Sequence, residues 1–429
     1  MTCPKFWSTH TSRGFLLIDI LLAMSLAFLY IYIFSTSYMG LENILNKTKA
    51  RVSEIGDSTT TEIILPQHIS ASDLPICSDN LLASSSTTTA APHESTSSNQ
   101  YASFTINQIS LPISQTVTDI EVRNNTVYAS TDSSVTSDSD IYIFDITSRS
   151  APQTVSSLNT GPGTSGISIV GRNLFAAAAS TAYQLHIIDI SNRSAPVILT
   201  RYKIPPPYAT ATMPLATAIA YSDIGSTTGK SYILIGTEKW DGNELNVIDV
   251  TDLLNPVWVS SIELGSKVNS IHVYRDIAYV TSAGPNQLVK INISDPFHPY
   301  ITNTFSPSGW SRQEGKTVNI YDDHLAFGRT SGGYDIATDH EYFIWPNDIP
   351  STTNASSTNI SSGVYGIIQD ASHAFVLTRQ PGRELMVFSS KTANIIASSS
   401  IPLTPRSMTC DFNRFYISAL NAPIIYELY

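Results

Sequence analysis

Short runs of alternating apolar and polar residues recur through the chain from residue 104 to the C-terminus. One phrase consists of an apolar strand, an Asp or Asn, an Ile or Val, a Ser or Thr, and a Pro seven positions after the Asp or Asn. Such alternation predicts half-buried β-strands, and the Asp or Asn predicts a turn in which its side chain accepts backbone N–H groups. The phrase occurs four times, in residues 141–152, 185–196, 245–256 and 288–299.

A second phrase, two short apolar strands joined by a polar turn, precedes the first and marks the repeat along the chain. Its copies are spaced by about 45–50 residues, which is the length of one four-stranded blade of a β-propeller. The number of copies predicts an all-β, seven-bladed β-propeller. They occupy residues 120–129, 167–176, 218–234, 271–280, 318–327, 366–376 and 408–417.

The two ends of the repeat region predict how the ring closes. The last unit supplies strands in 408–417 and 423–428 but no fourth strand, whereas the strand-like run 104–111 precedes the first unit. We expect 104–111 to complete the last blade, because closure removes the strand edges that otherwise invite aggregation. The Pro of the first phrase is expected to begin the outer strand, where a missing N–H is tolerated.

These repeats resemble the LVIVD-type propeller repeat of bacterial surface proteins, over roughly residues 105–429. The resemblance implies the propeller fold and says little about activity, since propellers serve both enzymes and binding modules. The fifth unit departs most from the pattern, because residues 342–346 lack the Asp-Ile-Ser phrase and 351–362 form a polar insertion.

A different pattern occupies the N-terminus. A short polar leader ends at Gly14, and the apolar run 15–34 that follows is long enough as a helix to cross a bilayer. The run contains one charge, Asp19, which is costly in lipid and is therefore expected to have a function. Apolar residues then recur at spacings of three and four as far as Ile55, which predicts that the helix continues beyond the membrane and ends at Gly56.

The junction between the leader and the apolar run resembles the type IV prepilin cleavage and methylation motif. The resemblance implies that prepilin peptidase cuts after Gly14 and that the new N-terminal residue, Phe15, is methylated. It also implies that Asp19, at a position usually held by Glu, pairs with the terminal amine of a neighbouring pilin subunit during assembly. The alternatives are an ordinary signal anchor and a secretory signal, although the apolar run is longer than a secretory signal requires.

Residues 57–103 contain long runs of Ser and Thr that cannot bury enough apolar surface to become ordered, which predicts a flexible stalk. The chain has three cysteines, of which Cys3 lies in the leader. An exported protein could join Cys77 and Cys410 in a disulfide, or the two could remain separate buried thiols.

Composition and net charge narrow the range of functions to be considered. Hydrophobic residues make up 42% of the chain and charged residues 14%, which suits an extracellular all-β protein better than a helical cytosolic enzyme. The net charge of −11 argues against nucleic-acid binding. Acidic clusters in 132–140 and 335–341 lack the spacing of a metal loop, and 241–244 is expected to be a hairpin turn. We therefore predict no catalytic residue, metal or cofactor.

The domains expected are a leader (1–14), a helix (15–56) that includes the transmembrane segment 15–34, a Ser/Thr-rich linker (57–103) and a propeller (104–429). We expect a minor pilin or pseudopilin, not an enzyme. A single span in the inner (cytoplasmic) membrane would hold the propeller outside the cell or in the periplasm, where it serves adhesion or binds an unidentified extracellular ligand. Its partners would be prepilin peptidase, other pilin subunits or the pilus assembly machinery, and the membrane. The alternatives are an anchored extracellular propeller enzyme, a hydrolase or lyase, and a tethered scaffold that never enters a pilus.

Overall fold

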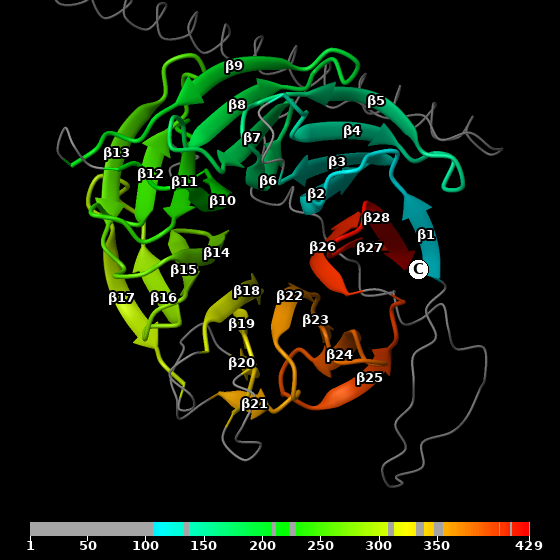
Figure 1. The fold of residues 1–429 in the computed structure, drawn as a ribbon. Coiled ribbons are helices and arrows are strands. Elements are labelled where there is room, and N and C mark those ends of the chain that lie inside the picture. Colours follow the sequence, from blue (N-terminus) through cyan, green and yellow to red (C-terminus); the bar gives the residue numbers. More distant parts are fainter. Residues whose placement is uncertain are drawn as a thin grey trace, which may run out of the picture. The chain divides into compact units, whose positions relative to one another are not determined.

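The chain folds into a ring of seven antiparallel sheets, each of four strands (Figure 1). The predicted leader, helix and linker lie outside the described residues, so these three assignments stay predictions. The seven-bladed, all-β prediction is confirmed. The computed structural model describes residues 106–132, 137–207, 212–223, 229–307, 313–331, 339–346, 355–402, 404–411 and 414–428.

The inner two strands are joined by a short turn in most blades, whereas residues 223–231 separate them in the third blade. The inner strands surround the central channel and mix buried with half-buried positions, and they are β2 (Val117–Arg123), β6 (Thr164–Val170), β10 (Ala216–Ser222), β14 (Val268–Tyr274), β18 (Gly315–Tyr321), β22 (Val364–Gln369) and β26 (Pro405–Asp411). The second strands are buried at every position after the first, and they are β3 (Thr126–Thr131), β7 (Asn173–Ala178), β11 (Tyr232–Thr237), β15 (Ile277–Ser282), β19 (His324–Arg329), β23 (His373–Thr378) and β27 (Arg414–Ala419).

The outer two strands of each blade differ sharply in exposure. The third strands are mostly buried, and they are β4 (Ile141–Asp145), β8 (Leu185–Asp189), β12 (Leu245–Asp249), β16 (Leu288–Asn292), β20 (Tyr342–Trp345), β24 (Leu385–Ser389) and β28 (Ile424–Leu428). The outer strands are largely exposed or half-buried, and they are β5 (Gln153–Leu158), β9 (Val197–Tyr202), β13 (Val257–Ile262), β17 (Tyr300–Phe305), β21 (Ser356–Thr358), β25 (Ile395–Ser399) and β1 (Ile106–Ser110). The polar insertion predicted in the fifth unit supplies the three-residue strand β21.

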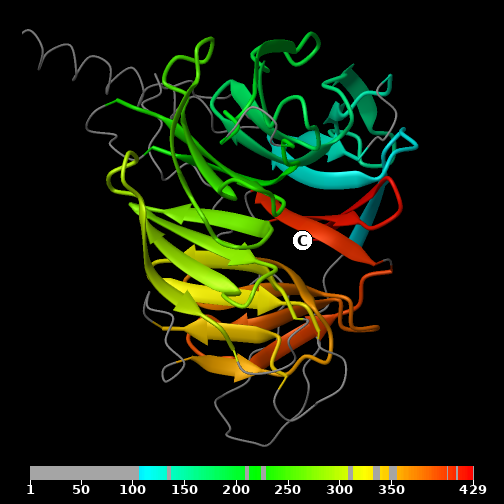
Figure 2. The same ribbon diagram turned by 60° about the vertical axis from the view of Figure 1, so that its left-hand side comes forward.

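The hydrophobic core lies between the blades, which pack face to face around the ring (Figure 2). Seven clusters of buried side chains are found among the described residues, and each joins two adjacent blades. Between the sixth and seventh blades, for example, the rings of Phe375 and Phe415 are 4.5 Å apart. Because each middle strand is covered by a blade on both faces, its apolar run is continuous and does not alternate.

The ring closes as the sequence predicts. β1 pairs antiparallel with β28, from Ile106 opposite Leu428 to Ser110 opposite Ile424. The last blade therefore takes three strands from the C-terminus and its outer strand from the start of the propeller. The last blade, where the two ends of the propeller meet, therefore has four strands like the others and leaves no unpaired strand edge between the first and last strands of the propeller.

The predicted Asp or Asn turns are confirmed in all four copies. The carboxylate Oδ1 of Asp145 accepts a hydrogen bond from the backbone N–H of Thr147 at 2.8 Å. Equivalent bonds join Asp189 to Ser191, Asp249 to Thr251 and Asn292 to Ser294, at 2.8, 2.9 and 3.0 Å. The Pro that ends each phrase comes directly before the outer strand. The most regular sequence motif of this chain thus forms the turn that connects the third strand of a blade to the fourth.

Candidate functional site

A β-bulge interrupts the pairing of every inner strand at the same place, one residue after the strand begins. In the first blade the register shifts between Val117 and Asp119, which leaves Thr118 without a partner on β3. The other six inner strands shift at the equivalent position. Bulges re-aim side chains, and here they define one ring of equivalent residues. The seven bulged residues are Thr118, Ser165, Thr217, Asn269, Lys316, Tyr365 and Arg406.

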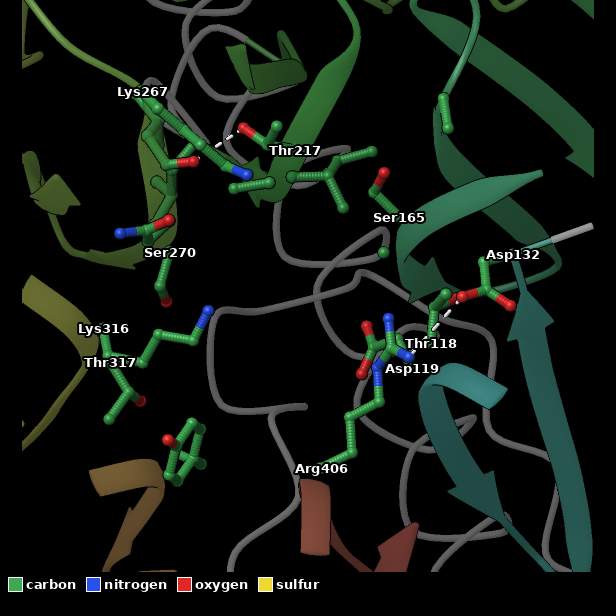
Figure 3. A pocket seen from close by; sticks show the side chains of 18 of the residues that line it. Thr118, Asp119, Asp132, Ser165, Thr217, Lys267, Ser270, Lys316, Thr317 and Arg406 are labelled. Atoms are coloured by element: carbon green, nitrogen blue, oxygen red, sulfur yellow. Dashed lines mark hydrogen bonds and ion pairs between the residues drawn. The ribbon is translucent and has the colours of Figure 1, made fainter. Parts of the chain in front are cut away.

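All seven bulged residues line one cavity of about 600 Å³ at the mouth of the central channel (Figure 3). Loops between second and third strands complete the wall with residues such as Asp132 and Arg379, and Lys267 joins it just before β14. The cavity is therefore at the end of the ring where the inner strands begin. Its volume lies within the range of about 300–1,000 Å³ that is usual for small-molecule sites.

Several bulged residues also fasten their blade to the next one. The Oγ1 atom of Thr118 donates to the backbone oxygen of Thr164 at 2.6 Å, and that of Thr217 donates to Val268 at the same distance. The Nδ2 atom of Asn269 donates to the backbone oxygen of Gly315 at 2.8 Å. Three of the five neutral members of the ring thus have a structural task, whereas the two charged members project into the cavity.

Four cations meet at the cavity: Lys267, Lys316, Arg379 and Arg406. Burial lowers the pKa of the Lys316 ammonium, and the positive charges of Lys267, Arg379 and Arg406 lower it further, while the Glu314 carboxylate opposes part of this shift. Burial likewise lowers the pKa of Arg406. Arg379 lies 3.6 Å from the ring centroid of Tyr365 and donates from Nε to the backbone oxygen of Pro405 at 3.2 Å, so its position is fixed. The mouth is a region of concentrated positive charge.

Two carboxylates, Asp119 and Asp132, share the cavity with these cations. Burial raises the pKa of Asp119 to about 6, although the backbone N–H groups of Ile167 and Ile120 donate to it at 3.1 and 2.9 Å. Asp132 forms a long ion pair with Arg406, 3.8 Å from Oδ2 to Nη1. Figure 3 shows Lys316 and Lys267 extending into the cavity from one side, with Asp119 and Asp132 across from them.

Further along the inner strands, burial shifts the pKa of two other titratable groups in the direction that favours the neutral form. It raises the pKa of Glu121 on β2 to about 7 and lowers that of His272 on β14 to about 4. One oxygen of Glu121, Oε2, is buried without a hydrogen bond and lies 4.0 Å from Nε of Arg123. Across the described ranges, no group of three or more His, Cys, Asp or Glu side chains is placed to hold a metal ion.

In six blades an acidic or amide side chain stands directly before the third strand, buried in five of them and half-buried at Glu384, and its role was not predicted from the sequence. Glu244, in the predicted hairpin 241–244, accepts the backbone N–H groups of Leu264 and Gly265 at 2.8 and 3.1 Å. In the other five blades, the equivalent segment between the outer strand and the next blade is bound in the same way. Its backbone is bound by the carboxylates of Asp140, Glu341 and Glu384 and by the amides of Gln184 and Gln287. These side chains satisfy the backbone of the loop that leads to the next blade. Asp140 and Glu341, from the two acidic clusters of the sequence, are therefore structural.

The predicted processing and assembly residues, Gly14, Phe15 and Asp19, lie outside the described residues, as does Cys77. Cys410 is buried on β26 and forms a disulfide whose partner also lies outside them. Its pairing with Cys77 stays a prediction. The part of the chain that the structure describes has no helix capable of crossing a membrane, and the predicted span 15–34 is not within it.

Comparison with known proteins identifies the repeat. The family model of the LVIVD repeat matches residues 165–204 and 265–306, which form the second and fourth blades. No curated protein sequence matches the chain.

Solved structures resemble the propeller at low sequence identity. Virginiamycin B lyase from Staphylococcus aureus has a TM-score of 0.53 and 12% identity, over 76% of this chain and 99% of the lyase. A catalytically inactive variant of that lyase with quinupristin has the same TM-score and coverage at 14% identity. The WD40 propeller domain of Doa1 has a TM-score of 0.52 and 10% identity, over 77% of this chain and 97% of the domain. At these identities the likeness establishes the fold alone. The chain is thus a seven-bladed β-propeller that carries LVIVD repeats.

Proposed function

We propose that the chain is a minor pilin or pseudopilin that prepilin peptidase processes and that displays its propeller at the cell surface for binding or adhesion. The observation that carries the binding role is the cavity at the channel mouth, to which all seven inner strands contribute. The pilin role rests on the leader that ends at Gly14, on Phe15, and on Asp19 in the apolar run. A propeller is much wider than one helix, so we place it at a tip or low-copy position, where it does not crowd a filament.

The chemistry of the cavity favours binding over catalysis. Its wall combines ammonium and guanidinium groups with hydroxyls, and three of the neutral bulged residues, Thr118, Thr217 and Asn269, are engaged in hydrogen bonds between blades. An anchored propeller enzyme is the second candidate, and Glu121 favours it, because a pKa of about 7 suits a general base. The two candidates differ in outcome, since an enzyme converts the compound it binds and a display head releases it unchanged.

The test of the pilin role is the mass of the mature N-terminus. The full chain is produced with and without a co-expressed prepilin peptidase, and intact mass and N-terminal sequence are measured. We expect loss of residues 1–14 and a methylated Phe15 only when the peptidase is present. Gly14→Ala should block cleavage, whereas Gly40→Ala, inside the predicted helix, should leave cleavage unchanged. An intact Met1 in the native host would reject the proposal.

Assembly is tested separately from cleavage. Asp19→Ala should leave the cut after Gly14 intact but remove the protein from sheared filaments, because the carboxylate that pairs with a neighbouring amine is lost. Asp19→Glu should retain or increase the filament fraction. If Asp19→Ala is found in filaments at the wild-type level, the chain is a tethered scaffold or assembles in another way.

A further inference from the structure

The charge at the channel mouth is opposite in sign to that of the chain. The protein carries a net charge of −11, yet the described residues that line this one cavity include four cations and two carboxylates. Cations that approach one another in a partly buried space repel, and the arrangement is unfavourable unless an anion compensates it. The excess of positive charge is therefore a feature that a bound anion would explain.

Lys316 is the side chain with the clearest need for a partner. It occupies the bulge of β18, and its ammonium extends into the cavity (Figure 3). Within the described ranges its side chain makes neither a hydrogen bond nor an ion pair, and three cations and one acid, Glu314, act on it electrostatically. Lys267, also in the wall, forms a long ion pair with Glu238, 3.9 Å from Nζ to Oε1, and both of these side chains are about half exposed. A carboxylate between these two ammonium groups would neutralise both.

The other side chains of the cavity wall add requirements on the ligand beyond a negative charge. Asp119 and Asp132 are hydrogen-bond acceptors across the cavity from Lys316, and the hydroxyls of Ser165, Ser270 and Thr317 also line it. Sulfate has no hydrogen to donate to the two carboxylates, and they would repel it. A ligand with one carboxylate and several hydroxyls satisfies both sides of the cavity.

We propose that the channel mouth binds an acidic saccharide, with its carboxylate at Lys316 and Lys267 and its hydroxyl groups facing Asp119 and Asp132. This inference rests on the proposed role of the propeller as a binding head and not on pilin processing. The cavity of about 600 Å³ holds a small ligand, either a free sugar acid or the end of an acidic polysaccharide.

The experiment is calorimetric titration of the full chain in detergent with N-acetylneuraminic acid, glucuronic acid and galacturonic acid. Galactose and glucose serve as uncharged analogues, and sodium sulfate and acetate serve as simple anions. We expect binding of at least one sugar acid, no binding of the neutral sugars, and weaker binding as salt concentration rises. Lys316→Gln should weaken affinity by about tenfold or more, since it removes a charge-assisted hydrogen bond. Lys391→Gln, the same change at an exposed lysine outside the cavity, should have no effect.

The source of the ligand is resolved with polygalacturonate and its monomer. The affinity for polygalacturonate is calculated per polymer chain. A value at least tenfold higher than that for the monomer identifies the end of a surface polysaccharide as the ligand, and equal values identify a free sugar acid. The proposal is overturned if sulfate or acetate binds as well as the sugar acids, if Lys316→Gln with a wild-type unfolding temperature binds them unchanged, or if none of them binds. The mass of the mature N-terminus does not depend on any of these results, so failure here leaves the pilin proposal to its own test.

Discussion

The Nη2 atom of Arg149, in the loop between β4 and β5, lies 2.9 Å from the Oε1 atom of Glu427 on β28. The Glu427 side chain is fully buried and also accepts hydrogen bonds from Arg414 at 2.5 Å and from the Tyr416 hydroxyl at 3.1 Å. Asn107 on β1 adds a longer bond of 3.4 Å. One carboxylate thus joins the first blade, the last blade and the strand that closes the ring.

Removing this carboxylate should loosen the closure. Glu427→Gln keeps the shape of the side chain but leaves Arg149 and Arg414 without a charged acceptor, so we expect a loss of about 2 kcal/mol in the free energy of unfolding. Urea denaturation measures it. Glu263→Gln is the matched control, because Glu263 pairs with Lys239 at 2.7 Å while half exposed, and its loss should cost less than about 1 kcal/mol. Equal losses in the two variants would contradict a special role for Glu427.

The same carboxylate predicts a dependence on acid. Burial alone would raise the pKa of Glu427, but hydrogen bonds from Arg149 and Arg414 lower it from 4.5 to about 2. The folded state therefore binds this proton less readily than the unfolded state, and the stabilisation is complete above pH 4.5 and lost as the pH falls toward 2. The difference in unfolding free energy between wild type and Glu427→Gln should be constant from pH 5 to 7 and shrink between pH 4.5 and 2. A difference that grows on acidification would disprove the assignment.

Gly315, the first residue of β18, cannot be replaced without moving the backbone. A Cβ atom at this position would lie 1.9 Å from the carbonyl oxygen of Gln287, which itself accepts the backbone N–H of Ser282. Gly315→Ala should destabilise the fold by about 2 kcal/mol or more, measured by urea denaturation. At Gly166 a Cβ atom would meet only ordinary contacts of 3.6 Å, and Gly166→Ala should change stability by less than about 1 kcal/mol. If Gly166→Ala were the more destabilising of the two, the close approach of the fifth blade to Gln287 in the fourth would be contradicted.

The bonds that bulged residues make to the next blade should be measurable one at a time. Thr217→Val preserves the volume of the side chain but leaves the backbone oxygen of Val268 without its hydroxyl donor, so we expect a loss of about 1 kcal/mol. Thr217→Ser keeps the donor and should retain most of the stability. If Thr217→Val is as stable as wild type, this hydroxyl does not fasten the two blades.

We expect the disulfide partner of Cys410 to be Cys77. The chain has three cysteines, and removal of the predicted leader takes Cys3 away. Peptide mapping of the mature protein without reduction should therefore give one linked pair, Cys77 with Cys410. A peptide of Cys410 linked to Cys3, or to a second chain, would refute this pairing and would bear on leader removal as well.

The sequence predicted well whatever depends on a local pattern. The Asp145 turn and its three equivalents, the Pro before each outer strand, and the number of blades all follow from phrases that repeat along the chain. The closing strand β1 was also predictable, because the last unit lacked a fourth strand and the run 104–111 had no blade of its own. Periodicity and turn chemistry act over a few residues, so they can be recognised without the fold.

The candidate site was not recognised in this way. Lys316 and Arg406 occupy the repeat position that Thr118 holds in the first blade, and an alignment of the repeats at the bulge would have grouped them. Their common cavity still depends on the ring, since equivalent positions in separate blades meet only when seven inner strands surround one channel.

Arg149 and Glu427 illustrate the same division, because 278 positions separate them and no spacing rule connects them. The amino-acid sequence by itself determined the strands, their turns and the number of blades, through interactions between near neighbours. Only the tertiary structure decided which charges meet, because closure of the ring brings residues from all parts of the chain to one axis and one seam.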